Sequence, residues 1–132
     1  MDAAQALADL AEISSQIRAA VLFDEGGAVL GSTLGDDGRA QQLVAAATEL
    51  LDAARAVAPG DTELVQLEAA TETGSVFVVG DGARRIVATT EPEPTVGLVF
   101  YDLKSCLRGV SEPGEKPKRA PRKRKEEQGD AA

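Results

Sequence analysis

Histidine is absent from this chain of 132 residues, and cysteine occurs only once, at Cys106. Without His the chain lacks the most common general base and cannot form a Ser–His or Cys–His nucleophile pair. One Cys without any His also argues against a transition-metal site. A lone Cys excludes an intramolecular disulfide and favours a reducing compartment. We therefore expect a protein that is not an enzyme and has no catalytic residue, metal or cofactor.

Tryptophan is also absent, and aromatic residues make up only 3 % of the chain. The core therefore has to come mainly from Ala, Val, Leu and Ile, within an apolar fraction of 43 %. No apolar run approaches the roughly 20 residues that cross a bilayer. The first residues lack the basic and then apolar segments of a secretory signal. These absences predict a cytoplasmic protein.

The net charge of −8 is unevenly distributed. Residues 1–112 carry seven basic and 18 acidic side chains, whereas residues 113–132 carry seven basic and four acidic ones. The second segment has no apolar residue beyond Ala and is rich in Pro, Lys, Arg and Glu, a composition that cannot form a core. We expect one folded domain over residues 1–112, which is close to the usual domain size, and a disordered basic tail over residues 113–132.

The first third of the chain predicts a helix followed by a β-hairpin. Residues 2–15 place Leu7 and Leu10 at helical spacing. The acidic and Gly-rich residues 25–27 are typical of a hairpin turn, and residues 28–34 form the return strand. The strand before this turn has an apolar period of two, and the residues on one of its faces are Ile17, Ala19, Val21 and Phe23.

A long helix over residues 39–57 is the clearest pattern in the chain. Asp36 or Asp37 can cap its first turn, and Pro59 ends it. Its predicted apolar stripe consists of Leu43, Ala47, Leu50, Leu51, Ala54 and Val57. The flanks carry small residues, namely Ala40, Ala45, Ala46, Ala53 and Ala56. These small flanks would admit a second helix, but a high Ala content alone explains them equally well.

Three strands are predicted next, over residues 63–69, 73–79 and 85–90, with a hairpin turn at residues 80–82. Residues 95–110 combine β-type composition with helical spacing of their apolar side chains, and their length favours a helix.

Three stretches resemble the roadblock/dynein-light-chain (roadblock/LC7) family of bacterial type. Residues 21–30 resemble its first hairpin, residues 75–82 its fourth strand and turn, and residues 95–103 the start of its last helix. The resemblance implies an α+β fold with a five-stranded antiparallel sheet flanked by helices, in the order α-β-β-α-β-β-β-α, which is roadblock/profilin-like. Members typically dimerise by pairing their central helices and joining sheet edges. The dimer interface expected on this chain comprises Leu43, Ala47, Leu50, Ala54, Leu64 and Gln66.

The same resemblance implies a function. Bacterial members are partners or regulators of small Ras-like GTPases, and some stimulate GTP hydrolysis by arranging the GTPase's own residues. An Ala- and Gly-rich chain without Asn suggests a high-GC bacterium, which fits this branch of the family. The resemblance therefore implies a non-catalytic homodimeric adaptor or regulator of a small GTPase in bacterial signalling.

Other chemistry has less support. No P-loop motif occurs, and residues 80–82 fit a turn better than a nucleotide loop. Cys106 falls on the apolar stripe of the last helix and is interpreted as a packed thiol. Arg84 and Arg85 could act as a finger in a partner's GTPase site, but charged turn residues explain them more simply. Two carboxylate pairs are interpreted as turn and capping residues, namely Asp36 with Asp37 and Glu91 with Glu93.

The tail supports a different function. Its seven cations could bind nucleic acid or an anionic membrane, with the domain serving as a dimerisation module. It could equally be a solubilising tail or fold back on the acidic domain. These cations are Lys116, Lys118, Arg119, Arg122, Lys123, Arg124 and Lys125. A third alternative, a small-molecule sensor, has the weakest basis because aromatic and convergent polar residues are scarce.

Overall fold

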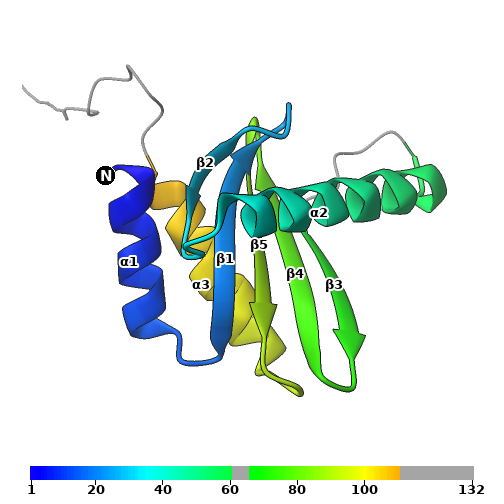
Figure 1. The fold of residues 1–132 in the computed structure, drawn as a ribbon. Helices are drawn as coiled ribbons and strands as arrows, with labels where there is room; N and C mark the ends of the chain where they lie inside the picture. Colours follow the sequence, from blue (N-terminus) through cyan, green and yellow to red (C-terminus); the bar gives the residue numbers. More distant parts are fainter. Residues whose placement is uncertain (61–65, 111–132) are drawn as a thin grey trace, which may run out of the picture.

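The structure, a computed structural model, describes residues 1–60 and 66–110. Its elements follow the predicted order (Figure 1). The predicted disordered tail, residues 113–132, lies outside the described residues, as does the beginning of the predicted strand 63–69. The elements are α1 (Ala3–Ile13), β1 (Ile17–Asp24), β2 (Val29–Ser32), α2 (Asp37–Val57), β3 (Gln66–Thr71), β4 (Gly74–Asp81), β5 (Arg84–Thr90) and α3 (Val96–Gly109).

The five strands form one antiparallel sheet in the order β2-β1-β5-β4-β3. The turn between β1 and β2 is the predicted one: Asp24 Oδ1 accepts hydrogen bonds from the backbone N–H groups of Gly26 and Ala28, at 3.0 and 2.9 Å. The predicted turn at residues 80–82 is wrong in its position. Both strands continue to the pair Asp81 and Arg84, so that only two residues connect them, which is the commonest hairpin loop.

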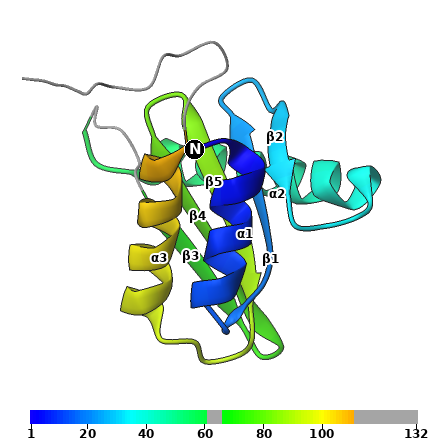
Figure 2. The same cartoon turned by 90° about the vertical axis from the view of Figure 1, so that its left-hand side faces the viewer.

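Helices cover both faces of the sheet, with α1 and α3 side by side on one face and α2 alone on the other (Figures 1 and 2). Successive β1 residues therefore belong to different cores: Ala20 and Leu22 pack with α1 and α3, whereas Val21 and Phe23 pack with α2. The predicted alternation fails at Ile17, which packs on the α1 and α3 side because the pairing register with β5 shifts after it.

The long helix α2 begins at Asp37, two residues before the predicted start. Asp36, one of the two predicted caps, accepts hydrogen bonds from the N–H groups of Gly38 and Arg39. The predicted stripe is only partly right. The side chains buried against the sheet are Ala40, Val44, Ala47 and Leu51. Val57, which was expected in the stripe, is 84 % exposed.

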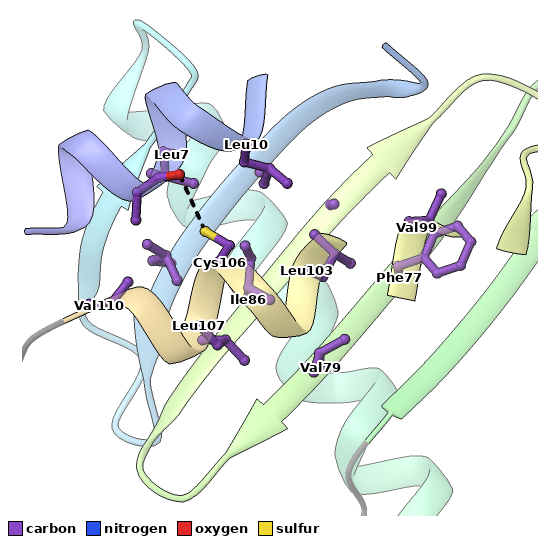
Figure 3. Packing of buried hydrophobic residues seen from close by; sticks show 14 residues of the cluster. Leu7, Leu10, Phe77, Val79, Ile86, Val99, Leu103, Cys106, Leu107 and Val110 are labelled. Atoms are coloured by element: carbon purple, nitrogen blue, oxygen red, sulfur yellow. Dashed lines mark hydrogen bonds between the residues drawn. The ribbon is translucent and has the colours of Figure 1, made fainter. Parts of the chain in front are cut away.

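The ambiguous segment 95–110 is a helix, α3, as its length predicted. Its buried side chains pack on β4 and β5 (Figure 3). The Phe77 and Phe100 rings meet edge to face with centroids 5.0 Å apart. Within the described residues, no helix is both long and apolar enough to span a membrane.

Candidate functional site: the exposed flank of α2 and the β3 edge

The two long flanks of α2 differ in character. One flank places Leu43, Leu50, Ala54 and Val57 in a row at helical spacing, and the first three of them are half-buried. The opposite flank carries polar side chains, among them Arg55 and Asp52, with 3.8 Å between Arg55 Nη1 and an Asp52 carboxylate oxygen. Apolar surface therefore continues beyond the part of α2 that its own sheet covers. We call this row the α2 flank.

The sheet below α2 is also incompletely covered. Helix α2 crosses the strands near one end and leaves the part of β3 and β4 next to their connecting turn without a helix on this face (Figure 1). Leu67 and Ala69 of β3 lie on this face, since they pair with Val78 and Val76 of β4. Leu67, Ala69 and Val76 are all half-buried. The α2 flank and this part of the sheet together present apolar surface on one side of the molecule.

The β3 strand forms one edge of the sheet. Its sequence, residues 66–71, has one charged residue, Glu68, and neither Lys nor Pro, so it lacks the usual devices that block strand addition. The other edge strand, β2, is only four residues long and α1 packs closely on it: a Cβ atom at Gly31 would lie 3.0 Å from the Ala3 Cβ. Of the two edges, β3 is therefore the one suited to pair with another chain.

The predicted interface residues are placed as follows. Leu43, Leu50 and Ala54 lie on the α2 flank, and Gln66 is exposed at the start of β3. Leu64 lies outside the described residues. Ala47 has no exposed surface, because it packs against the sheet of its own chain. Its contacts are therefore within this chain, and the prediction that Ala47 lies in an interface is wrong.

Cys106 is a packed thiol, as the sequence predicted. Its Sγ donates to the Ala6 carbonyl oxygen at 3.6 Å (Figure 3). Burial, with a smaller contribution from the negative charge of Asp9, raises the pKa of the Cys106 thiol to about 11. At neutral pH it is therefore held in the thiol form, which is a poor nucleophile.

The remaining candidates have structural roles or are exposed. Arg84 is half-buried and its guanidinium donates to the Val110 carbonyl oxygen, so that it fixes the end of α3 to the β4–β5 hairpin. This contact disfavours Arg84 as a finger. Asp36 acts as the predicted helix cap. Glu91 and Glu93 are exposed in the loop before α3. Among the residues that the structure describes, no group of three or more His, Cys, Asp or Glu side chains could hold a metal ion.

The sequence matches no protein-family model and no curated protein, whereas the fold matches solved structures. A roadblock/LC7 domain from Streptomyces avermitilis superposes with a TM-score of 0.73 at 18 % identity, over 82 % of this chain and 93 % of that one. The gliding protein MglB from Thermus thermophilus superposes with a TM-score of 0.67 at 19 % identity, over 79 % of this chain and 82 % of that one. MglB from Myxococcus xanthus gives 0.59 at 15 % identity, over 79 % and 77 %. The chain therefore has the roadblock/LC7 fold.

Proposed function

We propose that this chain is a non-catalytic homodimer that acts as an adaptor or regulator of a small Ras-like GTPase. The observation that carries the proposal is the open β3 edge next to the apolar α2 flank, in a chain with the roadblock/LC7 fold. These two features lie on one side of the molecule, where a twofold-related copy could use both at once.

The β3 edge and the α2 flank each lack a contact that a second copy of the chain would supply. An unprotected edge strand presents unpaired backbone N–H and C=O groups, and a second β3 strand running antiparallel would satisfy them. In the same arrangement the α2 flank of each protomer would cover the other's apolar surface, including Leu50 and Leu67. A twofold interface uses the same patch on both copies, so one self-complementary surface suffices. One of the MglB structures has a tetrameric arrangement, so a protein with this fold does self-associate.

The GTPase part of the proposal rests on the family that the sequence resembles and on the fold it shares with MglB. Regulators of this kind need a rigid surface rather than catalytic groups, because they act through the GTPase's own residues. The buried Cys106 thiol and the structural roles of Arg84 and Asp36 agree with that. The alternative, a tail-mediated nucleic-acid or membrane protein, depends on residues 116–125, which lie outside the described part of the chain.

The dimer is tested by analytical ultracentrifugation of the full-length chain. Leu50→Glu places a carboxylate in the proposed interface twice, once from each copy, and we expect it to weaken dimerisation at least about 100-fold, since interface anchors contribute about 2 kcal/mol or more each. Ala45→Glu is the matched control, because Ala45 is exposed on the side of α2 away from the sheet. A monomeric wild-type chain at micromolar concentration, or equal effects of the two variants, would contradict the proposed interface.

The partner is tested separately, with the full-length chain and a small Ras-like GTPase encoded in the same genome. We expect the chain to bind the GTPase preferentially in one nucleotide state, either GDP or a non-hydrolysable GTP analogue, and Leu50→Glu to weaken that binding. The rate at which the GTPase hydrolyses GTP, measured with and without the chain, shows whether the chain stimulates hydrolysis. A stable dimer that binds the GTPase in neither state would refute the regulator function and leave the interface intact.

A further inference from the structure

A cavity of about 170 Å³ lies between α1 and α3, on the face of the molecule opposite to α2. Its floor is apolar and includes Ala6, Leu10 and Cys106. Two carboxylates line it, Asp9 from α1 and Asp102 from α3. We call this cavity the α1–α3 groove. It is separate from the α2 flank and does not depend on the proposed GTPase function.

Asp102 is the unusual member of this groove. Its residue surface is only 6 % exposed. Within residues 1–60 and 66–110, it has neither a hydrogen-bond donor nor an ion-pair partner. Its carboxylate oxygens are not among the fully buried polar atoms that lack a partner, so they keep contact with solvent at the groove, where their charge attracts a cation. The groove, which Met1 also lines, thus presents a negative group on its wall to a cation that enters it.

Asp9 adds a second negative charge to the same groove. Its recorded contact is a neutral one, in which Gln5 Nε2 donates to its carboxylate at 2.9 Å. Asp9 and Cys106 both line the groove, and the charge of Asp9 contributes, after burial, to the raised pKa of Cys106. Two carboxylates above an apolar floor suit a cation on an aliphatic stem, since such a side chain buries its methylenes and presents its charge at the end.

The cations of α3 lie on its other side. Lys104 and Arg108 line a second hollow between α3 and the end of β4, together with Asp81. They are directed away from the α1–α3 groove, and neither lines it. Helix α3 therefore has an acidic side that faces α1 and a basic side that faces β4, and a cationic segment leaving its end is attracted to the acidic side.

The basic segment of this chain begins within reach of the groove. Gly109 lines the groove at one end, and the chain leaves the described part of the structure at Val110. The next cation in the sequence is Lys116, six residues beyond Val110, a length that can extend to about 20 Å. Asp102 lies eight residues back along α3, a rise of about 12 Å. Lys116 or Lys118 can therefore return to Asp102 without strain.

We propose that the α1–α3 groove is the docking site of this chain's own basic segment, residues 116–125, with a lysine ammonium placed between Asp102 and Asp9. The segment carries seven positive charges and no negative one, and the domain it would dock on is strongly acidic. Docking would hold the segment against the acidic domain, so the segment would bind phosphate-rich polymers or surfaces more weakly while it lies in the groove. The groove would in that way limit non-specific binding by the tail.

A nitroxide spin label placed in the tail of the full-length chain tests the proposal. Ala120→Cys supplies the attachment point, and at neutral pH the buried Cys106, with its raised pKa, should remain unlabelled; the wild-type chain treated in parallel checks this. We expect amide signals of Asp9 and Ser105, at the groove, to broaden several-fold more than those of Glu49 and Asp52 on α2. The difference should shrink in about 0.5 M salt, where charges are screened within a few ångströms.

Asp102→Asn is the deciding variant, because it removes the charge and keeps the size of the side chain. We expect it to abolish most of the excess broadening at α1 and α3, whereas Asp52→Asn on α2 should have no effect. Asp9→Asn is a second groove variant if Asp102→Asn perturbs folding. Broadening that is absent, that is equal over α1, α2 and α3, or that responds equally to Asp102→Asn and Asp52→Asn would overturn the proposal.

Discussion

Gly74, at the start of β4, is the position where the structure predicts the largest effect of a single added methyl group. A Cβ atom built on Gly74 would lie 2.4 Å from the backbone carbonyl oxygen of Thr90 in β5. This oxygen belongs to the sheet backbone and cannot rotate away as a side-chain atom would. Gly74 also has a φ of +158°, which side-chain-bearing residues rarely adopt. The Gly74→Ala substitution must therefore displace the β4–β5 pairing or the turn before it.

We expect Gly74→Ala to lower the free energy of unfolding by about 3 kcal/mol or more, combining about 1–3 kcal/mol for the forced backbone shift with a similar cost for the unfavourable conformation. In a domain of this size, that corresponds to a fall in Tm of about 12–24 °C. Unfolding followed by far-UV circular dichroism at a fixed protein concentration measures it, because the chain has no Trp and a dimer's Tm varies with concentration.

Two other glycines separate the causes. Gly82 has a φ of +65°, but no atom of the described residues lies within 4 Å of the position that an added methyl group would take. Gly82→Ala should therefore cost only the conformational strain, about 1 kcal/mol. Gly35 has open space and no positive φ, so Gly35→Ala should be neutral or stabilise slightly, by about 0.4–1 kcal/mol. If Gly74→Ala is no more destabilising than Gly82→Ala, the backbone of Gly74 does not lie close enough to the Thr90 carbonyl oxygen to exclude a methyl group, and the reasoning is refuted.

Two further predictions concern the thiol and the helix cap. The pKa of Cys106 is raised from 9.0 to about 11 in the folded chain, so between these pH values unfolding releases its proton. The free energy of unfolding should therefore fall as the pH rises from about 9 to 11. Urea titrations over this pH range should show a smaller fall for Cys106→Ala than for the wild-type chain. Thiol alkylation of the native chain should remain slow at pH 8. Asp36→Ala removes the acceptor that caps α2 and should cost about 1 kcal/mol, whereas Asp37→Ala should change stability by less than about half of that, as thermal unfolding of both variants would show.

The order of helices and strands was predictable because it depends on local physics. Asp36 can cap only the residues that follow it, and the Gly-rich segment after Asp24 favours a tight turn wherever the strands lie. The last helix was the harder case, since residues 96–101 have β-type composition. Length and spacing favoured a helix, and burial of Val99, Leu103 and Cys106 on one side confirms it.

The buried face of α2 was not predictable in detail. Its apolar residues extend over more than one face, from Val44 through Ala47 to Leu50, and periodicity alone does not say which part meets the sheet. The crossing of α2 over the strands decides this: Val44 and Leu51 face inward, Leu50 is at the margin, and Val57 has no strand to contact. The same crossing leaves the α2 flank available to a partner.

The charge in the α1–α3 groove gave little signal in the sequence. Asp102 stands between Tyr101 and Leu103 and would ordinarily be assigned to the exposed side of the helix. The one hint is its position one turn before Cys106, at the margin of the buried stripe. Its burial depends on α1, which comes from the opposite end of the domain and closes over that side of α3.

The sequence by itself determined the order of the elements, the cap of α2, the first hairpin turn, the uneven charge of residues 1–112 and 113–132, and the resemblance to roadblock/LC7 domains. These features arise from neighbouring residues and from composition, so they can be found without coordinates. The tertiary structure decided which side of α2 is open, that β3 is the unprotected edge, and that Asp9 and Asp102 line one groove. Each of these requires residues far apart in the chain to meet, and a pattern of spacing along the chain does not contain that information.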